Sequence, residues 1–501
     1  MVGNRRRRRR GMSAPRTIPA AIWHRQTQAS DPDVSAFVSA NAGSGKTHVL
    51  AQRAIRLLLN GTDPSKILCL TFTKAAAANM ATRVFDTLRR WTALDDTRLA
   101  DAIRAIGVAD LGSATMTRAR RLFAEAIETP GGLKVQTIHA FCTRLLHQFP
   151  FEANVAARFS VLDERAELEL LERESLAVLL DAAATPDGAL GRALNIVIAS
   201  AADTTIRDLI NEAIRKRDAV MRWIAQSGGP AGASAALAQM LGIAPEDTFA
   251  KIDADIIDGP AFPSCEWLRA AQICAAGTKR DNDQCERLRA AAAAAGTQRV
   301  DLYLPVFFTK ELEPRASIIT KPLAESHPSL ADNLAREQSR LIALLERRYA
   351  VVTRERTMAL LIIVHAAIAR YRAEKDRRGL LDYNDLIAKT LDLLDPKAMS
   401  WIHYKLDYGI DHVLIDEAQD TSPDQWEIIK RLVSEFAAGA GARALLKRTI
   451  FAVGDEKQSI FSFQGAAPHE FDNMRRQFER AFDRPGLGWR HVQFDYSFRS
   501  G

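Results

Sequence analysis

The segment ANAGSGKT, residues 40–47, has the residue types and spacing of a loop that holds phosphate. Gly43 and Gly45 let the backbone turn tightly, so that its N–H groups point inward at phosphate oxygens. Lys46 is predicted to reach the β and γ phosphates of a nucleoside triphosphate, and the Thr47 hydroxyl to bind Mg²⁺. The loop predicted to bind nucleotide consists of Ala40, Asn41, Ala42, Gly43, Ser44, Gly45, Lys46 and Thr47.

A second segment, HVLIDEAQDTS, supplies the acids that such a loop needs. Asp416 and Glu417 follow directly after a short apolar run that reads as a buried strand. Asp416 is predicted to hold the metal, directly or through water, and Glu417 to polarise the attacking water. We therefore expect hydrolysis of the nucleotide, and not binding alone.

The hydrophobic pattern indicates the elements that would position these side chains. Residues 37–39 read as the end of a buried strand, and residues 48–59 have the periodicity of a helix. Residues 412–415 are predicted to form a second short, buried strand. The succession of strand, glycine-rich loop and helix predicts an α/β fold. Several hundred residues separate the two halves of the site, so a large insertion between them is expected.

The composition is that of an ordinary globular protein. The chain has 501 residues, 47% of them apolar and 26% charged, which favours two or three domains. The formal charge of +7 hints at an anionic partner, and much of the excess lies in a basic tail, residues 1–19, that is expected to be disordered. The few cysteines suit a reducing cytosol. No apolar run has the length of a membrane span, so we expect a soluble, cytoplasmic protein.

Six segments occur in a specific order along the chain: ANAGSGKT, LTFTKAAAANMATRV, VQTIHAFCTRLL, VLIDEAQDTS, FAVGDEKQSIFSFQGA and FDYSFRS. In this order they resemble the motifs of superfamily 1 helicases of the UvrD, Rep and PcrA type. The DEAQD form and the opening stretch 29–59 are most similar to the AddA family, the RecB-related helicase-nuclease subunits of AddAB that process double-strand breaks. The resemblance covers about residues 20–150 and 375–501.

The resemblance implies a P-loop NTPase lobe of the RecA type that carries an inserted, mainly helical accessory domain. The lobe is expected over residues 20–158 and 376–501, and the insertion over 159–375. The implied activity is that of an ATP-dependent 3′→5′ DNA helicase that uses ATP and Mg²⁺ in break repair and recombination. The implied partners are single-stranded and duplex DNA and an AddB-type subunit, in the bacterial cytosol and at the nucleoid. The family's second RecA-like lobe and nuclease domain are not expected within this chain, which should then hydrolyse ATP very slowly by itself.

The resemblance also implies roles for residues outside the loop and the acid pair. Gln26 is similar to the glutamine that recognises the adenine edge, where an amide pairs well. Gln458 is similar to the residue that senses the γ-phosphate, and Arg499 to the arginine that contacts it. With Lys46, Asp416 and Glu417, these two complete the predicted catalytic set.

Other motifs are similar to segments that grip DNA. TFT and TIHAF follow predicted strands and resemble loops that contact the single-strand backbone, and FSF resembles a pair of aromatic residues on which bases stack. The residues predicted to contact DNA are Thr71, Phe72, Thr73, Thr137, His139, Phe461 and Phe463.

The middle of the chain is predicted to be helical, on the periodicity of stretches such as 164–183 and 340–378. Its basic residues admit two interpretations of equal weight. They contact duplex DNA, or they form a solvated helix face balanced by glutamates. The residues in question are Arg347, Arg348, Arg354 and Arg356.

Three alternatives to an AddA-like subunit stay open at this point. A stand-alone UvrD-like helicase would lack a nuclease domain. A phosphotransferase acting on a small molecule would hydrolyse ATP at a rate indifferent to DNA. A non-catalytic DNA-binding or assembly module would keep its ATP affinity when Lys46 is replaced by alanine.

Overall fold

The protein divides into two compact units. The computed structural model describes residues 20–41, 43–130, 132–395, 401–402, 409–438, 446–455 and 468–498. One unit contains the described residues up to Asp163 and from Arg378 onward, and the other consists of Glu164–Arg377. The chain of the first unit is therefore interrupted in sequence by the whole of the second.

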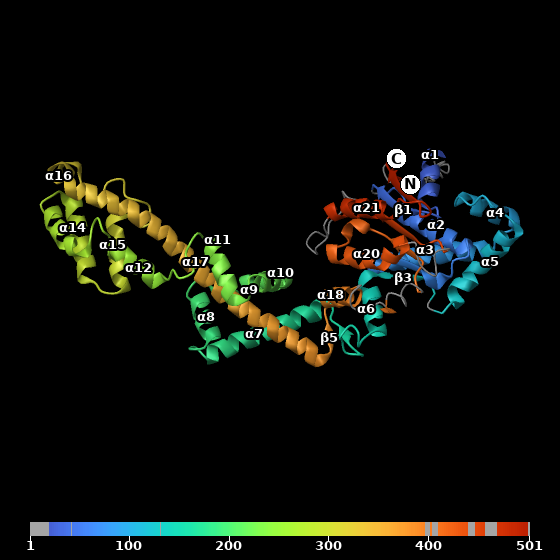
Figure 1. Ribbon diagram of the computed structural model, residues 1–501, viewed down its shortest axis with the longest axis horizontal. Helices are drawn as coiled ribbons and strands as arrows, with labels where there is room; N and C mark the ends of the chain where they lie inside the picture. Colours follow the sequence, from blue (N-terminus) through green and yellow to red (C-terminus); the bar gives the residue numbers. More distant parts are fainter. Residues whose placement is uncertain are drawn as a thin grey trace, which may run out of the picture. The chain divides into compact units, whose positions relative to one another are not determined.

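A six-stranded sheet forms the centre of the first unit (Figure 1). Its strands lie in the order β3-β2-β6-β7-β1-β8, and every neighbouring pair is parallel. The strands are β1 (Ser35–Ala40), β2 (Ile67–Thr71), β3 (Lys134–Thr137), β6 (His412–Ile415), β7 (Thr449–Gly454) and β8 (Trp489–Phe494). Strand β6 has the predicted bounds, and the predicted α/β class is confirmed.

Two hydrophobic cores lie on opposite faces of this sheet, because successive side chains of a strand point to opposite sides. In β1, Phe37 joins one core and Val38 the other; in β7, Ile450 and Phe451 alternate in the same way. The helices over the first core are α6 (Ile138–Gln148), α18 (Tyr383–Leu393), α20 (Pro423–Ala438) and α21 (Pro468–Phe482). Those over the second are α1 (Ala20–Ala29), α2 (Lys46–Leu59), α3 (Lys74–Thr92), α4 (Asp96–Ala105) and α5 (Ser113–Glu128).

Short elements complete the first unit. The chain leaves and re-enters it through a pair of parallel strands, β4 (Ser160–Val161) and β5 (Leu380–Leu381). After β5, Asp382 caps α18: its carboxylate accepts the backbone N–H of Asp385, whose own carboxylate accepts the N–H of Asp382. This reciprocal capping box gives both acids a structural role at the start of α18. Two single turns of 3₁₀ helix are η1 (Pro64–Lys66) and η3 (Ala418–Asp420).

The second unit is helical and is built along one helix of 51 residues, α17 (Pro328–Arg378). At 1.5 Å per residue, α17 is about 75 Å long. The remaining helices are α7 (Glu164–Ala184), α8 (Ala189–Ile198), α9 (Asp203–Arg215), α10 (Arg217–Gln226), α11 (Pro230–Met240), α12 (Phe249–Ile257), η2 (Ser264–Glu266), α13 (Trp267–Cys274), α14 (Lys279–Ala293), α15 (Thr297–Phe307) and α16 (Lys321–Ser326). No helix in the described part of the chain combines the length and apolar character that crossing a bilayer requires.

The arginines of α17 that the sequence left between two interpretations mostly have partners within this unit. Arg347 donates to both carboxylate oxygens of the buried Asp247, at 3.0 and 2.9 Å. Arg348 donates to Asp253 at 2.9 Å. Arg354 is buried and donates to three backbone carbonyls in the connection between α11 and α12. These contacts hold α17 against its neighbours and account for three of the four arginines without DNA.

Candidate nucleotide-binding site

Strand β1 leads through the glycine-rich loop into α2, as predicted. Gly43 has a φ of 72° and Gly45 a φ of 89°, in the left-handed region that favours glycine. The N–H of Asn41 donates to the carbonyl of Phe494 at 3.3 Å, and the N–H of Phe498 donates to the carbonyl of Gly43 at 2.9 Å. The segment that follows β8 therefore fixes the loop from the side.

The two halves of the predicted site meet at one edge of the sheet. Nζ of Lys46 lies 2.6 Å from a carboxylate oxygen of Glu417, and the Thr47 hydroxyl lies 3.5 Å from a carboxylate oxygen of Asp416. Strand β7 separates β1 from β6, and because all three strands are parallel, both loops emerge at the same edge. The amino end of α2 adds its positive field to this edge.

Asp416 is a buried carboxyl group. Only 3% of the residue is exposed. Burial, and after it the neighbouring Glu417, raise its pKa to about 6 against the opposing effect of Lys46. The backbone N–H of Glu417 donates to Asp416 at 3.1 Å. A carboxylate that is costly to ionise in this position gains from a bound cation.

Gln419 is a residue of the site that sequence reasoning missed, although it lies inside the DEAQD motif. Its amide nitrogen donates to Glu417 at 2.9 Å, and its amide oxygen accepts the N–H of Asp455 at 2.8 Å. Glu417 itself has a left-handed backbone, with φ 50° and ψ 46°, which is uncommon outside glycine and is often found at functional sites. Gln419 thus joins the Glu417 carboxylate to the end of β7.

The side chains present fit a nucleotide with Mg²⁺. Thr47 and Asp416 supply the oxygen ligands that Mg²⁺ prefers, and such sites usually take their remaining ligands from substrate phosphates and water. The hydroxyl of Ser44 is buried in the loop and has no hydrogen-bond partner among the described residues. A buried donor without a partner is unusual, and a phosphate oxygen would satisfy it.

The amide of Gln26 and the rings of Tyr496 and Phe498 lie beside the loop, on the side away from β6, the strand that precedes Asp416 and Glu417. Gln26 on α1 is buried, and its amide nitrogen lies 3.3 Å from the position that a Cβ on Gly45 would occupy. The ring of Phe498 lies 3.6 Å from the same position and meets Tyr496 edge-on, with centroids 5.1 Å apart. Sequence reasoning assigned neither ring, although both belong to the FDYSFRS segment. A buried amide beside a half-exposed ring suits a flat, hydrogen-bonding base.

The described residues predicted to contact DNA are Thr71, Phe72, Thr73, Thr137 and His139. They lie at the ends of β2 and β3, where Thr71 and Thr137 are partners in register. The hydroxyls of Thr73 and Thr137 cap α3 and α6 by accepting backbone N–H groups. His139 packs against Tyr383, with ring centroids 4.9 Å apart, and burial lowers its pKa. Several of these side chains therefore also have structural contacts.

Five predicted site residues lie outside the described residues: Ala42, Gln458, Phe461, Phe463 and Arg499. Their predicted roles stay predictions. Among the described residues that border these positions, Asp455 lies at the end of β7 and Phe498 is held against the loop.

Comparison with known proteins finds relatives that match most of this chain. The A subunit of the ATP-dependent helicase/nuclease of Latilactobacillus sakei is 26% identical over 475 residues, which are 88% of this chain and 49% of the relative. The proteins of the same name from Lactobacillus helveticus and Anoxybacillus flavithermus are 24% and 26% identical, over 92% and 93% of this chain and 38% of each relative. The chain thus spans half or less of the length of these relatives.

The resemblance to AddA-type subunits is confirmed by these relatives. The family described as the UvrD/REP helicase N-terminal domain matches residues 24–479. That range contains the glycine-rich loop, the acid pair and the whole helical unit between them. The chain therefore belongs to the UvrD/REP helicase N-terminal domain family.

Proposed function

We propose that the first unit binds ATP with Mg²⁺ and hydrolyses it to drive movement along DNA. The observation that carries this proposal is the meeting of Lys46 with Glu417 and of Thr47 with Asp416, at 2.6 and 3.5 Å. A cation, a hydroxyl and two carboxylates at the amino end of a helix are the groups that hydrolysis of a phosphoanhydride needs. When bound, the metal neutralises phosphate charge.

The Lys46–Glu417 ion pair suggests how binding prepares the site. Phosphate oxygens compete with Glu417 for the Lys46 ammonium, because both are anions within reach of the same side chain. Once Lys46 turns to phosphate, the amide of Gln419 is the donor that the described residues leave to the Glu417 carboxylate. It is then free to accept a proton from the attacking water, with its position fixed by that amide.

The nucleotide base is proposed to lie beside α1. Gln26 would hydrogen-bond the adenine edge, and the ring of Phe498 would stack on the base. Gln458 and Arg499 are proposed to contact the γ-phosphate. Support for this placement of the base comes from the packing of both Gln26 and Phe498 against Gly45 of the loop.

The proposed DNA path crosses the ends of β2 and β3. Thr71, Phe72, Thr73, Thr137 and His139 would contact the backbone of a single strand, and Phe461 and Phe463 would stack on bases. The whole protein is proposed to be an ATP-dependent 3′→5′ helicase subunit that acts with an AddB-type partner on broken DNA in the bacterial cytosol. The names of the relatives, which describe one subunit of a helicase/nuclease, support this assignment.

The test replaces Lys46 by alanine. We expect Mg²⁺-dependent ATP binding, measured with a fluorescent ATP analogue, to fall at least about a hundredfold, because charge-assisted bonds to phosphate are lost. Lys430→Ala is the matched control, because this lysine lies on α20 and pairs with Glu427 of the same helix. Unchanged ATP affinity in the Lys46→Ala variant would refute the proposal. ATP hydrolysis by a longer version of the protein should in addition respond to single-stranded DNA, as a small-molecule kinase would not.

A further inference from the structure

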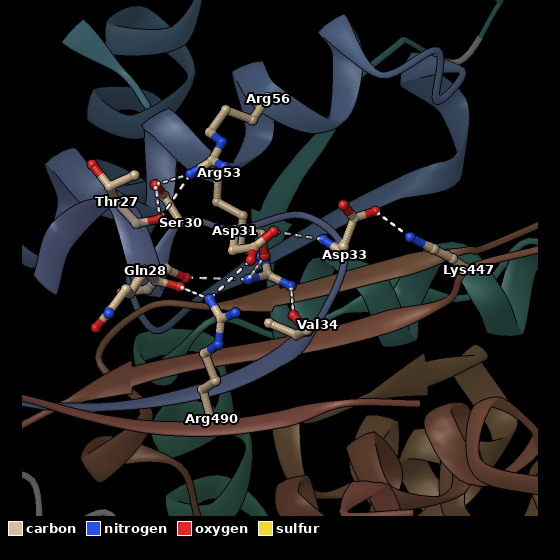
Figure 2. Close-up of polar contacts among 11 residues, drawn as sticks. Thr27, Gln28, Ser30, Asp31, Asp33, Val34, Arg53, Arg56, Lys447 and Arg490 are labelled. Atoms are coloured by element: carbon tan, nitrogen blue, oxygen red, sulfur yellow. Dashed lines mark hydrogen bonds and ion pairs between the residues drawn. The ribbon is translucent and has the colours of Figure 1, made fainter. Parts of the chain in front are cut away.

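The carboxyl end of α1, the helix that carries Gln26, is capped by arginines that come from other elements (Figure 2). Each guanidinium donates to one backbone carbonyl of the last turn. The pairs are Arg56 with Thr27, Arg490 with Gln28 and Arg53 with Ala29, at 2.8, 3.3 and 3.2 Å. The last carbonyls of a helix lack partners within it and carry a partial negative charge, so cations are favoured there.

Arg53 is the most deeply buried of the three, with no exposed surface. Besides α1 it donates to the carbonyls of Asp31 and Val34 at 2.6 and 2.5 Å, and to the Thr449 hydroxyl on β7 at 3.0 Å. Burial lowers its pKa to about 9, so it stays charged at neutral pH. A planar fork with several donors satisfies this set of acceptors, which a lysine cannot do.

Arg56 makes a smaller set of contacts with one nitrogen. The same Nη1 that reaches Thr27 also donates to the hydroxyl of Ser30, at 2.9 Å, and Ser30 is fully buried. At the rim, Arg490 pairs with Asp31 at 2.8 Å and Lys447 with Asp33 at 2.7 Å. Figure 2 shows these groups surrounding the turn that joins α1 to β1.

One helix therefore touches both ends of the proposed nucleotide site. Helix α2 starts at Lys46, and Arg53 and Arg56 follow two and three turns later on one face, since residues three apart lie side by side. Through them α2 holds the turn of α1 on which Gln26 lies. The distance between the phosphate loop and Gln26 is thus set by a rigid element and buried charged bonds.

We propose that Arg53 and Arg56 are positioning residues for base selectivity: by capping α1 they hold the Gln26 amide at a fixed distance from the phosphate loop, where it distinguishes adenine from guanine. This inference rests on the proposed ATP site and deepens it. Neither arginine touches the nucleotide. Phosphate binding should not require them, because the loop and Lys46 have their own contacts.

The experiment compares three ligands, ATP, GTP and inorganic tripolyphosphate, by competition against a fluorescent ATP analogue on the full chain. The Arg56→Ala variant is expected to lower the ratio of ATP to GTP affinity about tenfold, the discrimination that one well-placed amide supplies. Its affinity for tripolyphosphate should stay that of the unaltered protein. Arg56→Lys should restore the ratio, because a single ammonium can replace one nitrogen. Arg98→Ala, which removes an exposed arginine of α4, is the control.

The outcomes separate the inference from the proposed function. An unchanged ATP-to-GTP ratio in Arg56→Ala would overturn the inference, and so would an equal loss of affinity for all three ligands, which would mark a purely structural role. If the unaltered protein bound tripolyphosphate but showed no preference for ATP over GTP, the proposed phosphate site would be supported and the inference overturned. If the unaltered protein bound none of the three ligands, the proposed function itself would fail.

Discussion

Replacing Asp416 by asparagine should stabilise the metal-free protein at pH 8 while abolishing Mg²⁺-dependent nucleotide binding. Asparagine keeps the shape of the side chain and can still accept the Glu417 N–H, but it carries no charge. The buried carboxylate is costly to ionise, as its raised pKa shows. Ionised Asp416 is therefore predicted to destabilise the metal-free protein, and a bound cation would offset that cost.

The magnitude follows from the pKa. The pKa of Asp416 rises from 3.8 to about 6 on folding. The folded state then binds more protons than the unfolded state between these values, so the group's favourable contribution is complete below pH 4 and is lost as pH rises through 6. The loss amounts to about 3 kcal/mol.

The assay is calorimetric unfolding of the unaltered protein and the Asp416→Asn variant between pH 4 and 8, with and without Mg²⁺. At pH 4 the two should differ little in stability, because Asp416 is protonated in the folded state and only partly ionised in the unfolded state. Above pH 6 the variant should unfold at a temperature several degrees higher, at about 2–4 °C per kcal/mol for a unit of this size. A variant that is less stable than the unaltered protein at pH 8, or a difference independent of pH, would refute the reasoning.

Three other predictions concern separate parts of the molecule. Gly45→Ala should weaken ATP binding and lower stability by about 1–2 kcal/mol, because φ is 89° and the new Cβ would lie 3.3 Å from Gln26. ATP-binding and thermal-melting experiments measure the two effects. A variant with unchanged affinity and stability would show that the turn does not require glycine at this position. His412 is buried with a pKa of about 3, so only the unfolded state binds a proton on this side chain between pH 3 and 6.5. Relative to the His412→Asn variant, the unaltered protein should therefore lose about 2 kcal/mol of unfolding free energy on going from pH 8 to 5. Chemical denaturation measures this free energy, and a difference between the two proteins that does not change with pH would argue against the prediction. Arg354→Met should lower the stability of the helical unit by about 2 kcal/mol, because three backbone carbonyls lose their donor. Its affinity for duplex DNA, measured by gel shift, should not change. Weaker DNA binding without a loss of stability would instead favour the interpretation that Arg354 contacts DNA.

Much of the local structure was predictable from short patterns. A buried apolar run and the acids after it gave β6 its bounds at His412–Ile415. The loop was recognisable because a tight turn with a left-handed backbone favours glycine, and Gly43 and Gly45 have that backbone. The motif order was sufficient to identify the family. These signals depend on residues close together in the sequence, so they can be read without knowing which distant segments pack against them.

The sequence by itself therefore determined which segments form the glycine-rich loop, the acid pair and the helical unit. Only the tertiary structure decided that β7 separates β1 from β6, that Gln419 supports Glu417, and that Arg53 caps a helix it does not belong to. The physical reason is that strand order and buried hydrogen bonds depend on which distant segments pack together. A pattern of period two or 3.6 reports which face of an element is buried, but not the partner that covers it.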